Sequence, residues 1–314
     1  MQSTMKKDSL YKAKKRFKRN EFIFIWGGLT IPLISWVLYY WYVNFSSFVL
    51  AFQDMSTGKF TLGNFQTVFE SIFNPINERD SLARGFKNTM GYFLLDVCVE
   101  YPIHIFLPYF LYKRIPGHKT LRYLLLLPSM IPGIALASVY KIVIEPNGIL
   151  ERIFGWDIPP QGLLNDPNTA TSMIMIYKLW ITSCGCLLLY GGAMSRIPVE
   201  ILESTRMDGI KPFRELISII LPLIWPTVSI NLLMTCCQCL NANGPILLLS
   251  PNNYDTGTTT IAYWIFSKVY NYGTMSDGGA YNLASAAGLL LTLVVFPLSI
   301  GLRKMFSKIP TAEY

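Results

Sequence analysis

Residues 197–222 read IPVEILESTRMDGIKPFRELISIILP, and this polar segment stands between two long apolar stretches. Pro198 suits the first turn of a helix, where its missing N–H costs nothing. Asp208-Gly209 then marks the end of that helix, because glycine tolerates the left-handed conformation in which helices terminate. Pro212 opens a second helix. The segment thus predicts a helix, a glycine elbow and a second helix, a shape suited to a groove on a partner; an ordinary amphipathic loop is the alternative.

Both predicted helices carry side chains at helical spacing. In the first helix, Glu203 and Arg206 are three residues apart, which is close enough to pair on one face. The second helix has an apolar stripe at the i, i+3, i+4 and i+7 positions. Its members are Phe213, Leu216, Ile217 and Ile220.

The composition excludes an ordinary soluble domain. The chain is 52% hydrophobic and 15% charged, and its mean hydropathy is +0.36. A helix needs roughly 20 residues to cross the hydrocarbon core of a bilayer. The candidate stretches are 22–53, 88–112, 123–140, 179–194, part of 216–249, and 279–302. We therefore expect an all-α integral membrane protein with six transmembrane helices.

The distribution of Lys and Arg predicts the orientation of the chain. With the N-terminus inside, the inner segments hold 19 of the 27 basic residues and the outer segments hold 6. This bias follows the positive-inside rule and explains the net charge of +8 without nucleic acid. The basic run 12–19 is interpreted as a topology determinant that touches anionic lipid, rather than as a polynucleotide patch. Both termini and the segment 195–218 are expected in the cytoplasm.

The polar segment resembles the EAA loop of permease subunits of bacterial ABC importers. The matching positions are Glu203-Ser204-Thr205, Asp208-Gly209, Ile219 and Leu221-Pro222. In that family the pattern is Glu-Ala-Ala, a short spacer, an Asp-Gly pair and then a Leu-Pro. Here Ser204 and Thr205 replace the two alanines, and Leu216 stands where an aromatic residue is common. These changes are small-for-small and apolar-for-aromatic, so the same docking geometry is expected.

The resemblance continues in order along roughly residues 85–305. Further matching positions are Asn88-Thr89, Arg122, Leu127-Pro128, Pro132, Glu145-Pro146-Asn147-Gly148, Leu164-Asn165-Asp166-Pro167, Trp180, Ile197-Pro198, and Ala284 with Ala286. The ordered set is similar to the maltose-permease-like, oligosaccharide-transporting branch in its short form. It implies the type I ABC importer permease fold, with its core at 85–305 and the EAA loop at 195–222. Residues 1–21 and 306–314 are then cytoplasmic tails, and 22–84 hold the first span and an outer loop.

For function, the resemblance implies an importer that is driven by partner ATPases in a bacterial cytoplasmic membrane. A second permease, as a heterodimer partner, two ATPase subunits and an extracytoplasmic binding protein that delivers an oligosaccharide are the implied partners. The ATPase-coupling residues carried over are Glu203, Ser204, Thr205, Arg206, Asp208 and Gly209. We find no Gly-rich phosphate loop, so ATP is expected on the partners, and no catalysis, cofactor or metal is expected on this chain. A permease for a non-sugar solute is the alternative.

Polar and aromatic side chains in the predicted spans are candidates for a sugar path, because amides bond to hydroxyl groups and aromatic faces stack on sugar rings. They are Asn231, Gln238, Asn241, Trp180, Thr182, Ser183, Tyr281, Asn282 and Ser285. Amides within lipid need partners and should face the bundle interior. The alternative is that they form interhelical hydrogen bonds that serve packing.

Asp96, Glu100 and His104 recur every four residues along the second predicted span. Ionisable groups within a membrane are functional candidates, so this stripe defines a rival hypothesis, an ion-coupled secondary transporter with a proton relay. The polar hairpin argues against it, and no inverted repeat is evident. We instead expect the stripe to face the partner permease or a polar interior.

The six cysteines fall in predicted spans and are expected to pack as small apolar residues rather than to bind a metal.

Overall fold

The computed structural model describes residues 20–54, 57–73, 82–183, 185–238, 244–250, 256–272 and 279–308. These residues form helices joined by turns, with an isolated antiparallel bridge between Gln53 and Phe60. Four helices are long and apolar enough to cross a membrane, and two bent helix pairs raise the number to six if each pair is one span. The predicted all-α membrane fold is confirmed.

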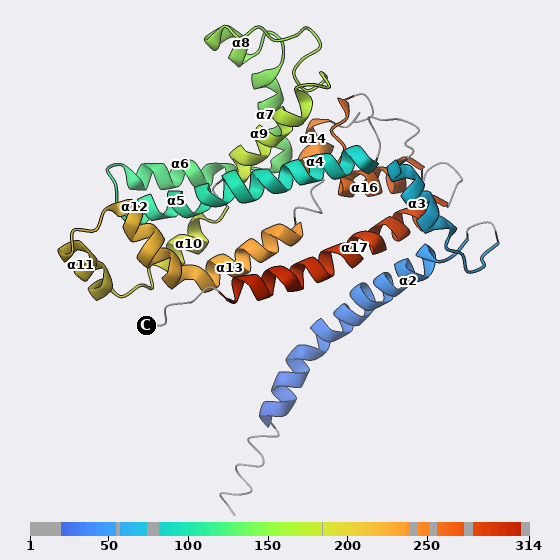
Figure 1. Cartoon of the computed structure of the whole chain (residues 1–314), viewed down its shortest axis with the longest axis horizontal. Coiled ribbons are helices and arrows are strands. Elements are labelled where there is room, and N and C mark those ends of the chain that lie inside the picture. The colour runs from blue at the N-terminus through green and yellow to red at the C-terminus, as the bar shows by residue number, and fades with distance from the viewer. Residues whose placement is uncertain are drawn as a thin grey trace, which may run out of the picture.

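The first span, Asn20–Ala51, diverges from the other helices over most of its length (Figure 1). It contains a π-helical turn, η1 (Trp36–Trp41), and ends in α2 (Tyr42–Ala51), which packs against α17 (Gly279–Phe306). The apolar side chains of this span are largely exposed, as suits a helix that faces lipid or another subunit. Next in the chain is α3 (Gly63–Phe73), which also packs on α17.

The second span is one continuous helix, Leu82–Tyr112. It consists of α4 (Leu82–Leu95), a π-helical turn η3 (Asp96–Glu100), and α5 (Tyr101–Tyr112). A π-helical turn inside an α-helix often marks a functional position, and here it contains two buried carboxyl groups. This span agrees with the predicted stretch 88–112 and begins one and a half turns earlier.

The third predicted span, 123–140, is not one straight helix. It falls on α6 (His118–Met130) and α7 (Gly133–Ile144), which meet at an angle of 104°. The break has a local cause, because Pro132 lacks an N–H donor and restricts the residue before it to an extended conformation. Ile131 has that conformation, with φ −94° and ψ 138°.

The fourth predicted span, 179–194, begins too late. The helix α9 (Ala170–Thr182) starts well before it and is followed, after a 41° bend, by α10 (Leu187–Met194). The predicted span starts after Lys178 because the charge of that lysine interrupts the apolar run. In the structure, Lys178 lies inside the protein and faces two carboxylates. Between α7 and α9 the chain forms a short helix, α8 (Ile149–Phe154).

The last part of the chain supplies the hairpin and the remaining spans. The elements are α11 (Val199–Met207), α12 (Pro212–Glu215), η4 (Leu216–Ile220), α13 (Leu221–Gln238), α14 (Gly244–Leu249), α16 (Ile261–Tyr272) and α17. In Figure 1, α13 and α17 run side by side, and α11 lies at one end of the molecule beyond the ends of α5, α6 and α13.

Three groups of buried apolar side chains hold these helices together. The first joins α5, α10, η4 and α13 at the base of the hairpin. The second joins α2, α3, the start of α4, α16 and α17. The third joins α4, α7, α9, α14 and α16. The hairpin is therefore continuous with the first of these packed groups.

Candidate functional site

The predicted hairpin is present with its predicted elbow. The first helix ends at Met207, and Gly209 has φ +64°, a left-handed conformation that strains residues with a β-carbon. The backbone N–H of Asp208 donates to the carbonyl of Ser204 at 3.0 Å. The second helix then begins at Pro212 as expected. A sharp reversal between two helices thus depends on a glycine.

Most of the candidate coupling residues are accessible on this hairpin. Glu203, Ser204, Asp208 and Gly209 are exposed. Thr205 is instead buried, and its hydroxyl donates to the carbonyl of Ile201 at 2.7 Å. The side chain of Arg206, and hence its predicted pairing with Glu203, lies outside the described part of the structure.

Apolar side chains are also exposed at the hairpin, a feature that the sequence interpretation did not use. Met207 is 87% exposed beside the elbow, and Val199 and Phe213 are each 62% exposed. Large exposed apolar side chains on an otherwise polar segment are typical of surfaces that bind other proteins. The hairpin therefore combines charged and apolar contact groups.

The second helix of the hairpin is fastened to the end of α5. Glu215 is only 3% exposed and pairs with Lys113, with 2.6 Å between Oε1 and Nζ. The hydroxyl of Tyr109 donates to the carbonyl of Pro212 at 2.9 Å. The rings of Phe106 in α5 and Phe213 in α12 also stack, with their centroids 6.0 Å apart. We call the Glu215–Lys113 pair and the Tyr109 hydrogen bond the hairpin clamp; nothing in the spacing of the sequence predicted it.

The predicted apolar stripe of the second helix is only partly right. Leu216 and Ile220 are buried, as expected, but Phe213 is 62% exposed and Ile217 is 46% exposed. The reason is the π-helical turn η4, in which hydrogen bonds run from i to i+5 and the α-helical i, i+3, i+4 spacing no longer defines one face.

The ionisable stripe of the second span pairs within this chain. Asp96 and Glu100 are 4% and 6% exposed, and both face Lys178 from α9. The Lys178 ammonium contacts Asp96 and lies 3.3 Å from Glu100 Oε2. His104 Nε2 is 3.6 Å from Glu100 Oε1 and 2.7 Å from the carbonyl of Thr182. Of the two environments expected for this stripe, a partner permease or a polar interior, the structure agrees with a polar interior. We call these four residues the charge cluster.

The charge cluster also weakens the proton-relay hypothesis. Lys178 supplies one positive charge to the two buried carboxylates, and buried charges need such a partner whether or not a proton is transported. The cluster joins the π-helical turn η3 to α9 and so has a structural explanation within the chain.

The eight described sugar-path candidates lie in different places, and most have local or packing contacts. Asn231 donates to the hydroxyl of Tyr190 at 2.9 Å, and that hydroxyl lies 2.8 Å from the hydroxyl of Tyr101. Asn282 instead donates to the carbonyl of Gln53 at 2.6 Å, near the end of the first span. The Asn231 bond joins two helices, and the Asn282 bond joins α17 to the segment after α2, so both amides have partners that serve packing.

The other candidates of this set are scattered. The hydroxyls of Thr182 and Ser183 donate to carbonyls one turn earlier in their own helix. Trp180, Gln238 and Tyr281 are exposed, and Ser285 is half-buried. Asn241 lies outside the described residues. None of the eight described candidates lines the cavity of about 1090 Å³ that lies beside the hairpin.

The Asn88-Thr89 pair has a structural role at the start of the second span. Asn88 donates to the carbonyls of Gly257 at 2.9 Å and Thr259 at 2.7 Å. The backbone N–H of Ile261 donates to the Thr89 hydroxyl at 3.1 Å. The pair thus holds the segment that leads into α16 against α4.

Among the described residues, no group of three or more His, Cys, Asp or Glu side chains is arranged to hold a metal ion. Among the described cysteines, Cys98, Cys186 and Cys237 are free thiols. Cys184 and Cys239 lie outside the described residues.

Known proteins similar to this chain include sugar permeases. The maltose/maltodextrin transport system permease protein MalF of Salmonella typhimurium is 31% identical over 201 residues, which are 60% of this chain and 38% of MalF. The multiple sugar-binding transport system permease protein MsmF of Streptococcus mutans is 22% identical over 286 residues, covering 88% of this chain and 92% of MsmF. This chain is homologous to MalF and MsmF. The match thus spans less than two fifths of the MalF length, and no family model matches the chain.

Solved structures share the fold. Two crystal structures of bacterial ABC transporters for alginate align with TM-scores of 0.77 and 0.76 at 21% identity. The alignments cover 94% and 95% of this chain and 99% of each matched chain. One of those transporters is in complex with an alginate pentasaccharide-bound periplasmic protein. The chain is therefore a multi-pass membrane protein with the permease fold of ABC importers.

Proposed function

We propose that this chain is the permease subunit of an ATP-driven importer that moves an oligosaccharide, delivered by an extracytoplasmic binding protein, across the bacterial cytoplasmic membrane. The observation that carries the proposal is the hairpin between α10 and α13, which is exposed at its elbow and fastened at its base. The homology to MalF and MsmF supports sugar as the class of solute.

The proposed partners are a second permease and two ATPase subunits. The hairpin would lie on the cytoplasmic side with both termini, as the distribution of basic residues predicts. ATP would then be bound and hydrolysed by the partner subunits, and this chain would bind no cofactor of its own. The exposed first span offers a surface for lipid or for the second permease.

The hairpin clamp gives this proposal a physical route for coupling. Glu203, Ser204, Asp208 and exposed Met207 would contact the ATPase, and Gly209 would set the angle between the two helices. A movement of the ATPase would displace α11 and α12 together. Because Glu215 binds Lys113 at the end of α5, the displacement would pass to the second span rather than being absorbed in a loose loop.

Affinity purification of the tagged chain from its native membranes tests this function. The comparison is between the normal chain, Gly209→Pro, and Gly155→Pro as a matched control. Gly155 also ends a helix, has φ +66° and has nothing within 4 Å of an added β-carbon, as is true of Gly209. Proline fixes φ near −65°, so it is equally incompatible with both sites.

We expect an ATPase and a second permease to co-purify with the normal chain and with Gly155→Pro. The Gly209→Pro variant should retain the second permease and lose the ATPase. If the normal chain is recovered alone, under conditions that preserve a known importer complex, the proposal is wrong. Uptake of labelled oligosaccharides into vesicles that contain the recovered complex, with amino acids as competitors, then tests the class of solute.

A further inference from the structure

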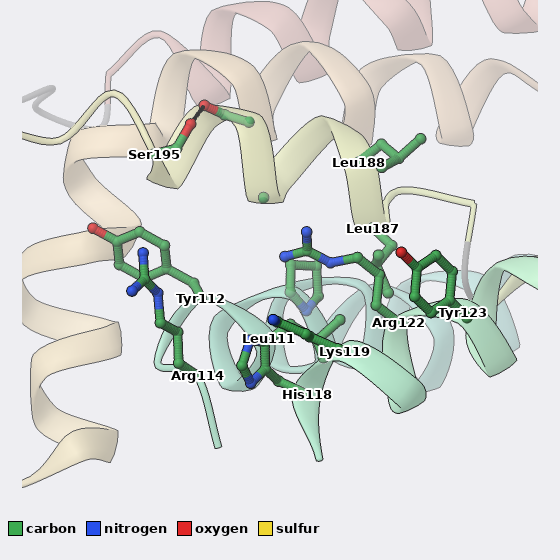
Figure 2. Close-up of a pocket in the computed structure, with 13 residues that line it drawn as sticks. Leu111, Tyr112, Arg114, His118, Lys119, Arg122, Tyr123, Leu187, Leu188 and Ser195 are labelled. Atoms are coloured by element: carbon green, nitrogen blue, oxygen red, sulfur yellow. Dashed lines mark hydrogen bonds between the residues drawn. The ribbon is translucent and has the colours of Figure 1, made fainter. Parts of the chain in front are cut away.

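A large cavity lies beside the hairpin, between the end of α5, the start of α6 and the end of α10. Its volume is about 1090 Å³. Figure 2 shows four basic side chains, Arg114, His118, Lys119 and Arg122, on the side formed by the α5–α6 turn and α6, with the guanidinium of Arg122 between α6 and α10. We call this space the basic cavity.

The positive charge of the basic cavity is uncompensated. None of its lining residues is acidic. In the part of the chain that the structure describes, Arg114, Lys119 and Arg122 form no ion pair, whereas the adjacent Lys113 pairs with Glu215. Three exposed cations that line one cavity without a carboxylate attract an anion. The first turn of α6, which no described side chain caps, adds the positive end of a helix dipole to the same region.

The basic cavity lies at the level where membrane spans end. The second span ends at Tyr112, the α6–α7 pair begins at His118, and the α9–α10 pair ends at Met194. Charged side chains at span ends lie among lipid headgroups, and basic pockets between spans bind anionic headgroups. The position of the basic cavity at a membrane surface follows from where the spans end, and it is the same for either orientation of the chain.

The opposite wall of the cavity is apolar and open. Leu187 and Leu188 from α10 line it, and Leu188 is 67% exposed. Tyr123, which also lines the cavity, is 72% exposed. On the same helix, Gly191 and Gly192 leave open space, since an added β-carbon would meet nothing within 4 Å. An anion that fits this cavity has a charged head for α6 and apolar chains that lie along α10.

We infer that the basic cavity binds the phosphate headgroup of an anionic phospholipid, with Arg114, Lys119 and Arg122 as headgroup ligands and Leu187 and Leu188 against the acyl chains. A free phosphate ion would use the same cations and leave the apolar wall without a contact. The inference goes beyond the proposed transport function and does not depend on it.

The test uses the full chain, with whatever subunits co-purify, in lipid nanodiscs of phosphatidylcholine that contain increasing fractions of phosphatidylglycerol. Lipid bound to the released protein is counted by native mass spectrometry. The double variant Lys119→Gln/Arg122→Gln is compared with Arg303→Gln/Lys304→Gln, which removes the same charge from the exposed last turn of α17. Each basic residue contributes about fivefold to affinity for anionic lipid, so the first variant should bind phosphatidylglycerol about 30-fold more weakly.

The control variant should retain phosphatidylglycerol better than Lys119→Gln/Arg122→Gln, because its two charges lie at a span end and do not line the cavity. Phosphatidylcholine should not be retained by either. Equal retention by the normal chain and Lys119→Gln/Arg122→Gln would overturn the inference. Displacement of the lipid by inorganic phosphate would assign the site to the free ion instead. Capture of a second polypeptide by a photo-crosslinker at Leu188 would show that another subunit fills the cavity, which also overturns it.

Two readouts separate folding and transport from lipid binding. A Lys119→Arg/Arg122→Lys variant keeps both charges and should restore lipid retention if the double Gln variant loses it for electrostatic reasons. Loss of retention in that variant as well would point to altered folding and contradict the inference. Co-purification of an ATPase is scored independently, so a failure of the transport proposal is visible without any change in bound lipid.

Discussion

Replacement of Lys178 by Met should destabilise the protein through the charge cluster. The substitution keeps most of the side-chain volume and removes the positive charge that faces Asp96 and Glu100. The side chains of the two carboxylates are 5% and 8% exposed, and that of the lysine is 13% exposed. Breaking a buried ion pair by removing one partner costs about 3–5 kcal/mol, because it leaves an uncompensated buried charge.

The expected loss is large enough to measure by thermal unfolding in detergent. For domains of about 150–250 residues, 1 kcal/mol shifts Tm by roughly 2–4 °C, so Lys178→Met should lower Tm by on the order of 10 °C. The matched control is Lys141→Met, since Lys141 is a half-buried lysine in α7 that forms no ion pair with any described residue. It should shift Tm by no more than a degree or two, that is by about 0.5 kcal/mol or less.

A triple variant tests the reasoning more sharply. Asp96→Asn/Glu100→Gln/Lys178→Met removes all three charges together and leaves no unpaired ion, so it should recover most of the Tm that Lys178→Met loses. If the triple variant is as unstable as the single one, the cost lies in packing rather than in charge. A single variant with the same Tm as the normal chain would show that the cluster is not a buried ion pair at all.

Three further substitutions probe the hairpin and the second span. Gly209→Ala should lower uptake per ATP hydrolysed, since a β-carbon at φ +64° costs about 1 kcal/mol or more, whereas Gly155→Ala should leave that ratio unchanged. Glu215→Gln removes the charge that binds the lysine of the hairpin clamp, at a cost of about 1.5–3 kcal/mol, and should reduce hydrogen-exchange protection of α12; equal protection would refute the clamp. Asn88→Ala removes a buried amide that donates to two carbonyls and should lower Tm by a few degrees, from about 1–3 kcal/mol. An unchanged Tm would show that water replaces the amide.

Much of the fold follows from local chemistry that a sequence displays. The elbow at Gly209 and the start of α12 at Pro212 were predicted because the conformations of glycine and proline depend little on tertiary context. The spans were predicted because the absence of charge over many residues is visible in a sequence. The bend after α6 was missed, although Pro132 is the residue that causes it.

The errors arise where charge is balanced across helices. The fourth span was predicted to begin only after Lys178, because the sequence does not show which residues balance the charge of this lysine. Its partners lie about 80 residues earlier in the chain, and no spacing rule relates them. Glu215 was overlooked within an apolar stripe for the same reason, since Lys113 precedes it by 102 residues. The π-helical turns change which side chains face the core. The spacing of side chains in the sequence does not predict where such turns occur.

The second span is a continuous helix of 31 residues, so it reaches about 45 Å from end to end. Asn88 fastens it near one end to the segment before α16, the charge cluster fastens it to α9 midway, and Lys113 fastens it to the hairpin just past the other end. A single helix that is attached at three points along its length cannot tilt at one end without displacing the contacts at the other two points. A displacement of the hairpin would therefore be transmitted along this one helix to the contacts at the opposite face of the membrane.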